Sequence, residues 1–282
     1  MRPRAIKDLA QLTDSMFHAE AAEGLGLVIS NARRLYASAT ALAETKHFHG
    51  SRVLQALSEE EASKYLVLLD AVRCPRQPPV RFTAQLARFN DHLAKGLYAR
   101  AYWLRPESLA QLQEYLDPYR ADFYLDGPND VDWIFRNEII YDREAALYVD
   151  YVAQDNGHTW LHPGIYDDAS FGAFVHTEPM VLRIASRLYD VGVSTPDALA
   201  VIAKVWRPLD TVQELRWPAI QQQNSLTLEC LDQKHLLQEC PATEYQEIVN
   251  RWQFPLYPLD LSPLRVDVES LREKQRHWHP DW

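Results

Sequence analysis

The stretch His49–Arg73, HGSRVLQALSEEEASKYLVLLDAVR, carries the clearest signal for the fold. Its hydrophobic residues recur at the spacing of one helix face, and they are Val53, Leu54, Ala56, Leu57, Val67, Leu68, Ala71 and Val72. This periodicity predicts a core helix about 35 Å long, because an α-helix rises 1.5 Å per residue.

The middle of this predicted helix carries charge where a core helix should be hydrophobic. Glu60 and Glu61 stand one turn after Ala56 and Leu57, and Lys64 follows at a spacing that allows ion pairs on a helix. A buried carboxylate without a partner is strongly unfavourable, so we expect neighbouring helices to bring cations or hydrogen-bond donors to this turn. The alternative is that the turn faces water on a curved helix.

The composition favours a helical protein. The chain has 282 residues, 47% of them hydrophobic, which can build one large domain or two modest ones. With 9 glycines against 17 prolines, it is typical of helices broken by proline, so we predict an all-α fold. The three cysteines, Cys74, Cys230 and Cys240, form no CxxC pair, and their odd number suits a reducing cytoplasm.

The charge and the hydropathy limit the classes of partner. A net charge of -10 argues against a wide nucleic-acid-binding surface, although a local basic patch stays compatible with it. The chain shows neither a signal peptide nor an apolar run of membrane-spanning length. We therefore expect a cytoplasmic protein that does not enter a membrane. We also expect no metal site and no cofactor, since the cysteines show no zinc-binding pattern.

Several further helices are expected from the hydrophobic spacing and from the positions of proline. Their predicted ranges are 5–44, with a kink or short break near Gly24 and Gly26, then 81–103, 106–116, 133–149, 171–189, 195–206, 226–237, 243–252 and 268–277. A loop is expected at 126–130, and a polar, turn-rich segment at 150–164.

A row of basic side chains follows the edge of the predicted helix 81–103. Arg88, His92 and Lys95 succeed one another at steps of four and three, which places them on one helix face. An antiparallel helix after a short turn is the expected neighbour of the central helix, so this row could meet Glu60 and Glu61. A solvated basic face would explain the same spacing.

These features together resemble a known family. The motifs that carry the resemblance are Glu60-Glu61-Ala62-Ser63-Lys64, His92 followed by Lys95, Arg143-Glu144 leading into Leu147-Tyr148-Val149-Asp150, and a turn with Trp160 and Pro163. Their order and spacing are similar to those of the AbiV group of HEPN proteins, which belong to bacterial abortive-infection defence against phage. The likeness runs from about Phe17 to Gly164.

The resemblance implies a fold, an assembly and an activity. It implies a HEPN-like antiparallel helical bundle over residues 1–164, with residues 165–282 as a C-terminal helical extension packed on it. HEPN proteins are commonly homodimers, and many of their relatives are metal-independent ribonucleases. An RNA substrate and a restraining protein partner or antitoxin are therefore expected partners.

The residue types fit such chemistry in part. Metal-free RNA cleavage needs a group that moves the proton of the 2′-hydroxyl and a fixed cation near the phosphate. We expect His92 to be the acid or base and Arg88 or Lys95 to bind the phosphate of RNA. Glu60, Glu61 and Lys64 would order them. HEPN nucleases are known for four to six residues between Arg and His, whereas Arg88 and His92 have three between them.

Two other hypotheses stay open. In the first, the same polar residues form a buried network in a non-catalytic helical protein that acts through a protein partner. In the second, Glu20, Glu23, Glu60, Glu61 and His92 hold a metal, although the Glu-x-x-His pairs of di-iron bundles are missing. RNA cleavage in EDTA would separate the nuclease from both alternatives.

Overall fold

The computed structural model describes residues 5–124, 131, 134–154, 157–163, 177–209 and 212–277, with residues 152–154, 157 and 213 described by their backbone alone. The helices are η1 (Ile6–Gln11), α1 (Asp14–Glu44), α2 (Phe48–Arg73), α3 (Pro79–Ala87), η2 (Arg88–Asn90), α4 (His92–Ala101), α5 (Leu109–Arg120), α6 (Glu138–Ala145), α8 (Met180–Asp190), α9 (Pro196–Trp206), η5 (Val212–Glu214), α10 (Trp217–Asp232), α11 (Ala242–Arg251) and α12 (Val268–His277). Two short strands, β1 (Asp150–Gln154) and β2 (Gly157–Leu161), form a small sheet, and the all-α prediction is confirmed.

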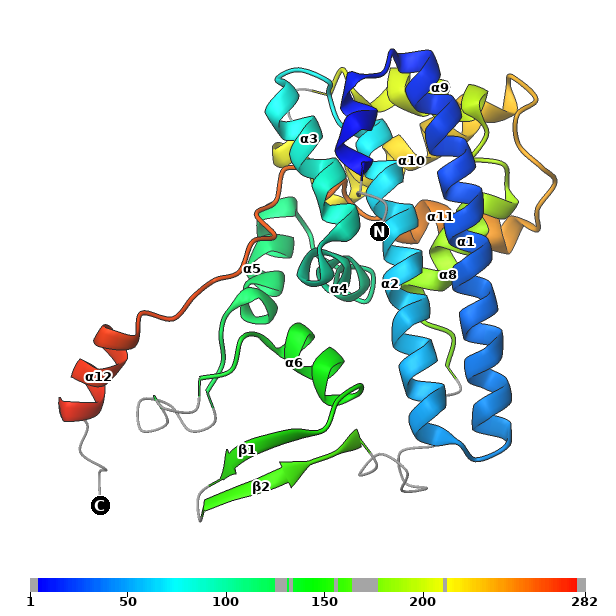
Figure 1. Cartoon of the computed structure of the whole chain (residues 1–282). Coiled ribbons are helices and arrows are strands. Elements are labelled where there is room, and N and C mark those ends of the chain that lie inside the picture. Colours follow the sequence, from blue (N-terminus) through cyan, green and yellow to red (C-terminus); the bar gives the residue numbers. More distant parts are fainter. Residues whose placement is uncertain are drawn as a thin grey trace.

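The frame of the molecule is the antiparallel pair α1 and α2, which stand side by side along its height (Figure 1). Two buried serines of α2 donate hydrogen bonds to carbonyl groups of α1. Ser51 Oγ lies 2.7 Å from the Ala39 oxygen, and Ser58 Oγ lies 2.8 Å from the Ala32 oxygen. These bonds fix the axial register of α2 against α1. The prediction of a helix over the stretch His49–Arg73 is confirmed.

Of the kink or short break expected near Gly24 and Gly26, the break is wrong, because α1 runs unbroken from Asp14 to Glu44, and the kink stays a prediction. The interruption comes earlier, at Thr13, whose side chain accepts a hydrogen bond from the Met16 amide at 3.4 Å and caps α1. A Cβ atom on Gly24 would lie 3.4 Å from Leu68 Cδ1. Gly24 thus faces Leu68 of α2 at ordinary van der Waals distance, and the helix continues through it despite the low helix propensity of glycine.

The single helix expected over 81–103 is also wrong. The segment divides into α3, η2 and α4, since Asp91 adopts an extended backbone and caps α4 by accepting the Ala94 amide at 3.2 Å. An N-cap residue has non-helical dihedrals, so a helix cannot continue through it. Arg88 and His92 therefore lie on different elements.

Two further helices differ in extent from their predictions. Ser108 caps α5, which begins at Leu109 and contains Pro118 in its last turn, where the sequence predicted its end. The helix expected over 133–149 is reduced to α6, which Asn137 caps by accepting the Ile140 amide at 3.0 Å. The loop expected at 126–130 lies outside the described residues.

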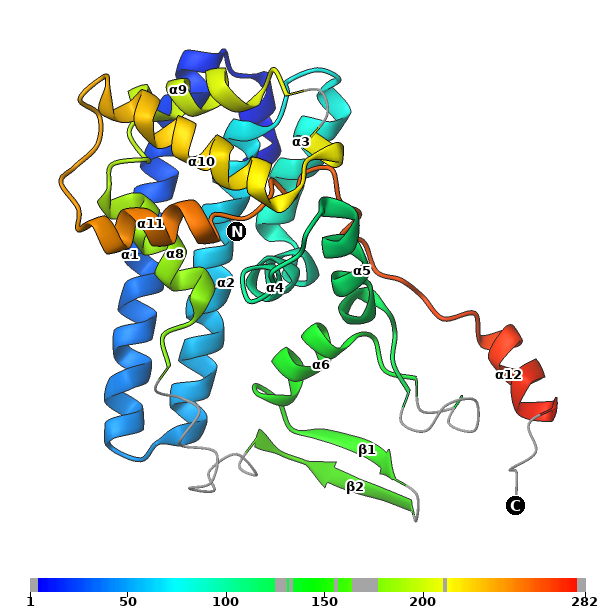
Figure 2. The same ribbon diagram turned by 180° about the vertical axis from the view of Figure 1, so that it is seen from behind.

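The turn-rich segment expected at 150–164 contains a β-hairpin. Strands β1 and β2 pair antiparallel, with Tyr151 opposite Trp160. The hairpin follows α6 and lies below it in Figures 1 and 2. The sequence carries a hairpin signal here, the dipeptide Asn156-Gly157 between two runs with β-formers.

The later helices cover the frame from one side. Helices α8 and α9 contact both α1 and α2. Helix α10 packs on α9 and α11 packs on α8, and both stand in front of the frame in Figure 2. Helix α9 begins after the predicted cap Thr195, and α11 and α12 begin and end within one residue of their predicted ranges. Helix α10 begins at Trp217, earlier than the predicted residue 226, and α8 occupies the later part of 171–189.

The division of the chain into residues 1–164 and 165–282 stays a prediction. The boundary falls in a segment that lies outside the described residues.

Candidate functional site

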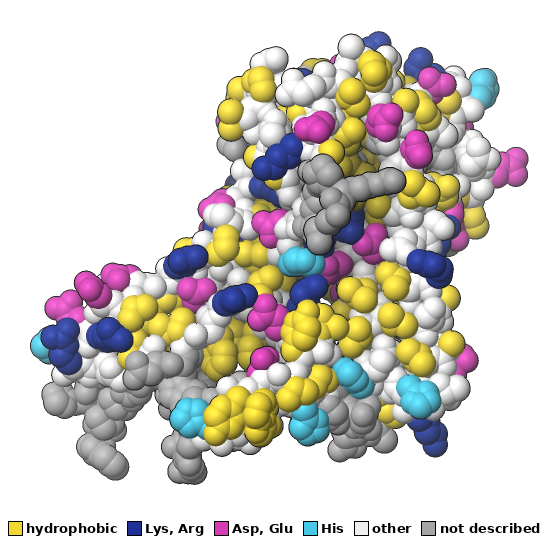
Figure 3. Space-filling view, in the orientation of Figure 1, with side chains coloured by type: hydrophobic (Ala, Val, Ile, Leu, Met, Phe, Trp, Pro, Cys, Tyr) yellow, Lys and Arg dark blue, Asp and Glu magenta, His cyan; other side chains and the backbone are white. Residues whose placement is uncertain are grey.

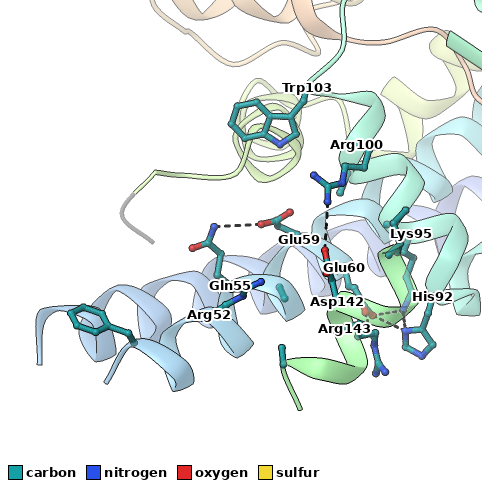
Figure 4. A pocket seen from close by; sticks show the side chains of 16 residues that line it. Arg52, Gln55, Glu59, Glu60, His92, Lys95, Arg100, Trp103, Asp142 and Arg143 are labelled. Carbon is teal, nitrogen blue, oxygen red and sulfur yellow. Dashed lines mark hydrogen bonds and ion pairs between the residues drawn. The ribbon is translucent and has the colours of Figure 1, made fainter. Parts of the chain in front are cut away.

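Glu60, in the middle of α2, is the centre of a cluster to which three elements contribute (Figure 4). Its Oε2 atom lies 2.6 Å from Lys95 Nζ and 2.9 Å from His92 Nδ1, both on α4. Its Oε1 atom lies 2.9 Å from Nε of Arg143, on α6. The prediction that helices bring cations to the acidic turn of α2 is confirmed for Glu60.

The four side chains are buried to different degrees. The exposed fraction of the side chain is 4% for Lys95, 17% for Glu60, 27% for Arg143 and 40% for His92. The Lys95–Glu60 pair is thus the inner part of the cluster, and the imidazole is its outer face. Solvent or a ligand can reach the imidazole.

The charges of the cluster shift the pKa values of its members. Burial alone would raise the pKa of Glu60, but the hydrogen bond and charge of Lys95, with His92 and Arg143, lower it below its ordinary value. Burial lowers the pKa of Lys95, and Glu60 opposes this effect. Burial, helped by Lys95 and Arg143, lowers the pKa of His92 despite the nearby Glu60 carboxylate. His92 is therefore neutral at pH 7, beside an ionised Glu60.

The contacts of His92 favour one tautomer. Nδ1 lies 2.9 Å from the Glu60 carboxylate and 3.2 Å from Lys95 Nζ, and the ammonium is already hydrogen-bonded to Glu60 at 2.6 Å. We assign the proton to Nδ1, which then donates to the carboxylate, since a carboxylate can only accept. Among the described residues, Nε2 has no hydrogen-bond partner, so its lone pair is available as a base.

A cavity of about 490 Å³ opens beside the cluster, between α2, α4 and α6. Its lining residues are Phe48, Arg52, Gln55, Ala56, Glu59, Glu60, His92, Lys95, Gly96, Ala99, Arg100, Trp103, Ile139, Asp142, Arg143 and Ala146. His92 also borders a second cavity of about 740 Å³, which includes Arg136 and Arg265. His92 therefore lines two cavities, and arginine side chains line each of them.

The second glutamate of the turn has a different environment. Glu61 forms an ion pair with Lys64 on the same helix, and these side chains are 18% and 21% exposed. The Lys64 ammonium lies 5.3 Å from the centre of the Phe89 ring. Glu61 and Lys64 flank the cluster, and no described contact joins either of them to His92.

Arg88 is not brought to the cluster. Its Nη1 atom donates to the Leu256 oxygen at 2.8 Å and to Gln85 Oε1 at 2.9 Å, and its Nη2 atom donates to the Leu259 oxygen. Arg88 thus anchors the segment after α11. The expected single face with His92 and Lys95 is wrong, because the chain turns at Asp91.

Arg143 is the site residue that the residue-by-residue reasoning missed. The sequence identifies it only as a part of the family resemblance, since it lies 83 positions from Glu60. The Arg143-Glu144 motif was the available signal. It could not show which of the two side chains faces α2.

The described side chains do not assemble the metal site considered for Glu20 and Glu23. Both are exposed on α1, roughly 10 to 15 Å along that helix from the level of Glu60. Within the described part of the chain, no group of three or more His, Cys, Asp or Glu side chains could hold a metal ion.

The fold and the site define a class of protein, a helical bundle with a histidine-carboxylate-cation cluster beside a cavity. The family model of HEPN_AbiV, described as AbiV, matches residues 20–174, which is more than half of the chain. The chain belongs to the AbiV family of HEPN proteins. No curated protein and no solved structure gives a significant match.

The matched range contains the whole cluster, from Glu60 to Arg143, and ends before α8. Among the described helices, none combines the length and the apolar character needed to cross a bilayer. The cytoplasmic location stays a prediction.

Proposed function

We propose that this protein acts in abortive infection as a metal-independent ribonuclease, with His92 as the base. One observation supports this above the others. The His92 imidazole has a lowered pKa and lines a cavity, its Nε2 has no partner among the described residues, and its Nδ1 meets Glu60, which also binds the cations Lys95 and Arg143. This is the arrangement of a general base held by a carboxylate.

The reaction would use each member of the cluster. His92 Nε2 takes the proton of a ribose 2′-hydroxyl, whose oxygen attacks the adjacent phosphorus. The bond from phosphorus to the 5′-oxygen breaks, and that oxygen takes a proton from water. The hydroxide left behind takes the proton back from His92. The products are a 2′,3′-cyclic phosphate and a 5′-hydroxyl. Glu60 holds the imidazole in its reactive tautomer and stabilises the imidazolium that forms.

The cations have separate roles in this proposal. Among the described contacts Arg143 uses only Nε, so its two terminal nitrogens can approach the charge that develops on the phosphate. Lys95 is 4% exposed, and its ammonium group keeps Glu60 ionised from the buried side of the cluster. With His92 neutral, the charges of Lys95, Arg143 and Glu60 add up to +1 for the cluster. The whole chain has a net charge of -10. RNA would bind at this local patch.

The test compares purified wild-type protein with His92→Ala, using total RNA in EDTA. His47→Ala is the matched control, because His47 is an exposed residue between α1 and α2. We expect His92→Ala to cut RNA about 100-fold more slowly or worse, the usual loss for a general base, and His47→Ala to match wild type. Identical RNA profiles for all three proteins would remove the catalytic proposal.

The homodimer expected from the family stays a prediction. Light scattering on the purified protein tests it, and a mass near 32.6 kDa would show a monomer.

A second candidate function is a non-catalytic protein that acts through a protein partner or an antitoxin. The observation that favours it is the aromatic surface of the hairpin, where hydrophobic side chains gather at the lower edge of Figure 3. Tyr151 and Trp160 are 60% and 66% exposed, and their ring centres lie 5.0 Å apart. Exposed aromatic groups of this kind are typical of binding surfaces.

Phage-infection assays separate the two functions. If the partner function holds, Trp160→Ser abolishes protection while His92→Ala protects as well as wild type. The nuclease function requires that His92→Ala fail to protect.

A further inference from the structure

We propose that the end of the cavity away from His92 is a nucleobase-binding subsite, in which Glu59 contacts the hydrogen-bonding edge of the base next to the cleaved bond. This inference rests on the proposed ribonuclease function and adds a source of base preference to it. The cavity, its lining and the position of its charges support the proposal in turn.

The cavity has two chemically different ends, which Figure 4 shows. His92, Lys95 and Arg143 gather around Glu60 at one end. Gln55 and Glu59 lie on α2 toward the other end, with Arg100 and Trp103 of the α4 side above them. A nucleotide is divided in the same way, into an anionic phosphate and a planar, uncharged base.

The cavity lining includes apolar side chains, and helices α4 and α6 pack closely beside it. Ala56, Ala99 and Ile139 line the cavity, and a Cβ atom on Gly96 would lie 2.2 Å from Ile139 Cγ2. Gly96 thus lets α4 and α6 approach each other at this wall. Trp103 is 51% exposed at the cavity and offers an indole for stacking. Apolar walls with a few polar groups are typical of sites for planar organic ligands.

The polar groups beyond the Glu60 cluster are the acids Glu59 and Asp142, and Arg52 and Arg100 line the same cavity. Glu59 accepts a 3.4 Å hydrogen bond from Gln55 Nε2, and burial raises the pKa of its carboxyl group, opposed by Gln55 and Arg100. Burial also raises the pKa of Asp142, whose carboxylate lies 3.9 Å from Arg100. An ionised carboxylate accepts hydrogen bonds, and its protonated form can also donate one.

The position of the proposed base sets the direction in which a nucleotide enters. His92 must reach the 2′-hydroxyl beside the phosphate, so the phosphate lies at the near end, where Arg143 and Lys95 also lie. The edge of a base presents donors and acceptors that a carboxyl and an amide can pair with. The phosphate therefore lies at His92 and the base lies at Glu59.

The first experiment measures the base preference of cleavage. A random-sequence RNA pool is cut by wild type, Glu59→Ala, Glu59→Gln and Glu114→Ala, an exposed control on α5, and the new ends are sequenced. We expect wild type and Glu114→Ala to share one preference at the position next to the cut. Glu59→Ala should reduce that preference about tenfold while cutting continues, and Glu59→Gln should retain most of it, because an amide also donates and accepts. An unchanged preference in Glu59→Ala would overturn the subsite.

The second experiment does not depend on cleavage. The His92→Ala protein is titrated calorimetrically with nucleoside 5′-monophosphates and with ribose 5-phosphate. We expect at least one nucleotide to bind about tenfold more tightly than the sugar phosphate, the gain typical of stacking, and Trp103→Ala to remove that difference. Equal affinities for nucleotides and sugar phosphate would overturn the subsite. Absence of cleavage by wild type would instead refute the proposed function, while this titration would still decide on the subsite.

Discussion

Helix α2 carries two clusters that are each centred on an acidic residue, Glu60 and Asp70, and they differ in how they meet solvent. Asp70 is 1% exposed. Its Oδ2 atom accepts hydrogen bonds from the Tyr98 hydroxyl and from the Leu256 amide, both at 2.8 Å, and its Oδ1 atom accepts from Arg73. This cluster joins α2 to α4 and to the segment after α11.

The cation of the Asp70 cluster is equally enclosed. Arg73 is 1% exposed and donates to the Gln253 oxygen at 3.1 Å. Its guanidinium lies 4.8 Å from the ring centre of Trp206 and 5.0 Å from that of Trp252. Carboxylate and guanidinium have protein partners on all sides, so the pair stabilises the fold and leaves no atom for a ligand.

The Glu60 cluster contains the same kinds of charge but is open on one side. Its histidine is 40% exposed and lines a cavity that Arg143 also lines. The comparison shows that residue type alone does not separate a structural ion pair from a candidate site. The separation comes from whether every polar atom already has a partner inside the protein.

The largest expected effect is on the closed cluster. Asp70→Ala should lower the free energy of unfolding by about 3 to 5 kcal/mol, because it leaves Arg73 buried without a counter-charge. Urea unfolding measures this. The control is Asp190→Ala, whose 2.7 Å pair with Arg33 is on the surface and should contribute about 1 kcal/mol or less. Similar losses for both variants would contradict the distinction between the clusters.

Glu60→Gln should have a smaller effect on stability. It leaves Lys95, which is 4% exposed, without its carboxylate but keeps the shape of the side chain. We expect a loss of about 1 to 3 kcal/mol in the free energy of unfolding. Glu61→Gln is the neighbouring control and should lose less. Equal losses at the two positions would show that Lys95 does not depend on Glu60.

The stability loss of Glu60→Gln should also depend on pH. The pKa of Glu60 is lowered in the folded protein, so its stabilisation is complete above the ordinary glutamate pKa and is lost as the pH falls through the folded pKa. The difference between wild type and Glu60→Gln should therefore shrink in acid. Unfolding curves at pH 7 and at pH 4 measure it, and a constant difference would contradict the ion pairs of Glu60.

The rate of RNA cleavage should depend on pH through His92. A base must be neutral, so the rate falls by up to about tenfold per pH unit below the pKa of His92 and levels off above it. Because burial and the neighbouring cations lower that pKa, the fall should begin below the usual pH of about 6.5. Initial rates between pH 4.5 and 8 would show this, and a fall that begins above pH 7 would contradict a neutral imidazole.

The smallest effect is expected for Glu61→Ala. Its pair with Lys64 lies within one helix and both side chains reach solvent, so we expect a loss of about 0.2 to 1 kcal/mol. Differential scanning fluorimetry against Glu23→Ala, an exposed residue of α1, measures the change in melting temperature. A loss as large as that of Glu60→Gln would place Glu61 in the cluster as well.

The sequence was informative wherever the signal is local. The period of apolar residues identified α2, and the cap Thr195 placed the start of α9. The acidic turn predicted a meeting with His92 and Lys95, which the structure confirms for Glu60. A short antiparallel connection makes the following helices the natural neighbours of α2, so these contacts needed little knowledge of the global fold.

Other features depended on competition between local signals. Asp91 could extend a helix or cap one, and capping divided the predicted helix 81–103 and moved Arg88 away from His92. The polar and aromatic residues at 150–164 predicted irregular turns, whereas the structure pairs Tyr151 with Trp160 in an antiparallel hairpin. A side chain at a helix boundary changes direction by large angles when the boundary moves by one residue.

By itself, the sequence determined the helical class, the family likeness and the presence of a charged turn inside an otherwise apolar helix. Periodicity, capping and residue type are properties of neighbouring positions, so they can be seen without coordinates. Only the tertiary structure decided that Glu60 rather than Glu61 binds a cation of α4, and that Arg143 joins them from 83 positions away. It also decided that Asp70 pairs with Arg73 inside the core, whereas His92 lines a cavity. The burial of a side chain, and whether its polar atoms find hydrogen-bond partners, depend on which segments distant in the sequence pack together.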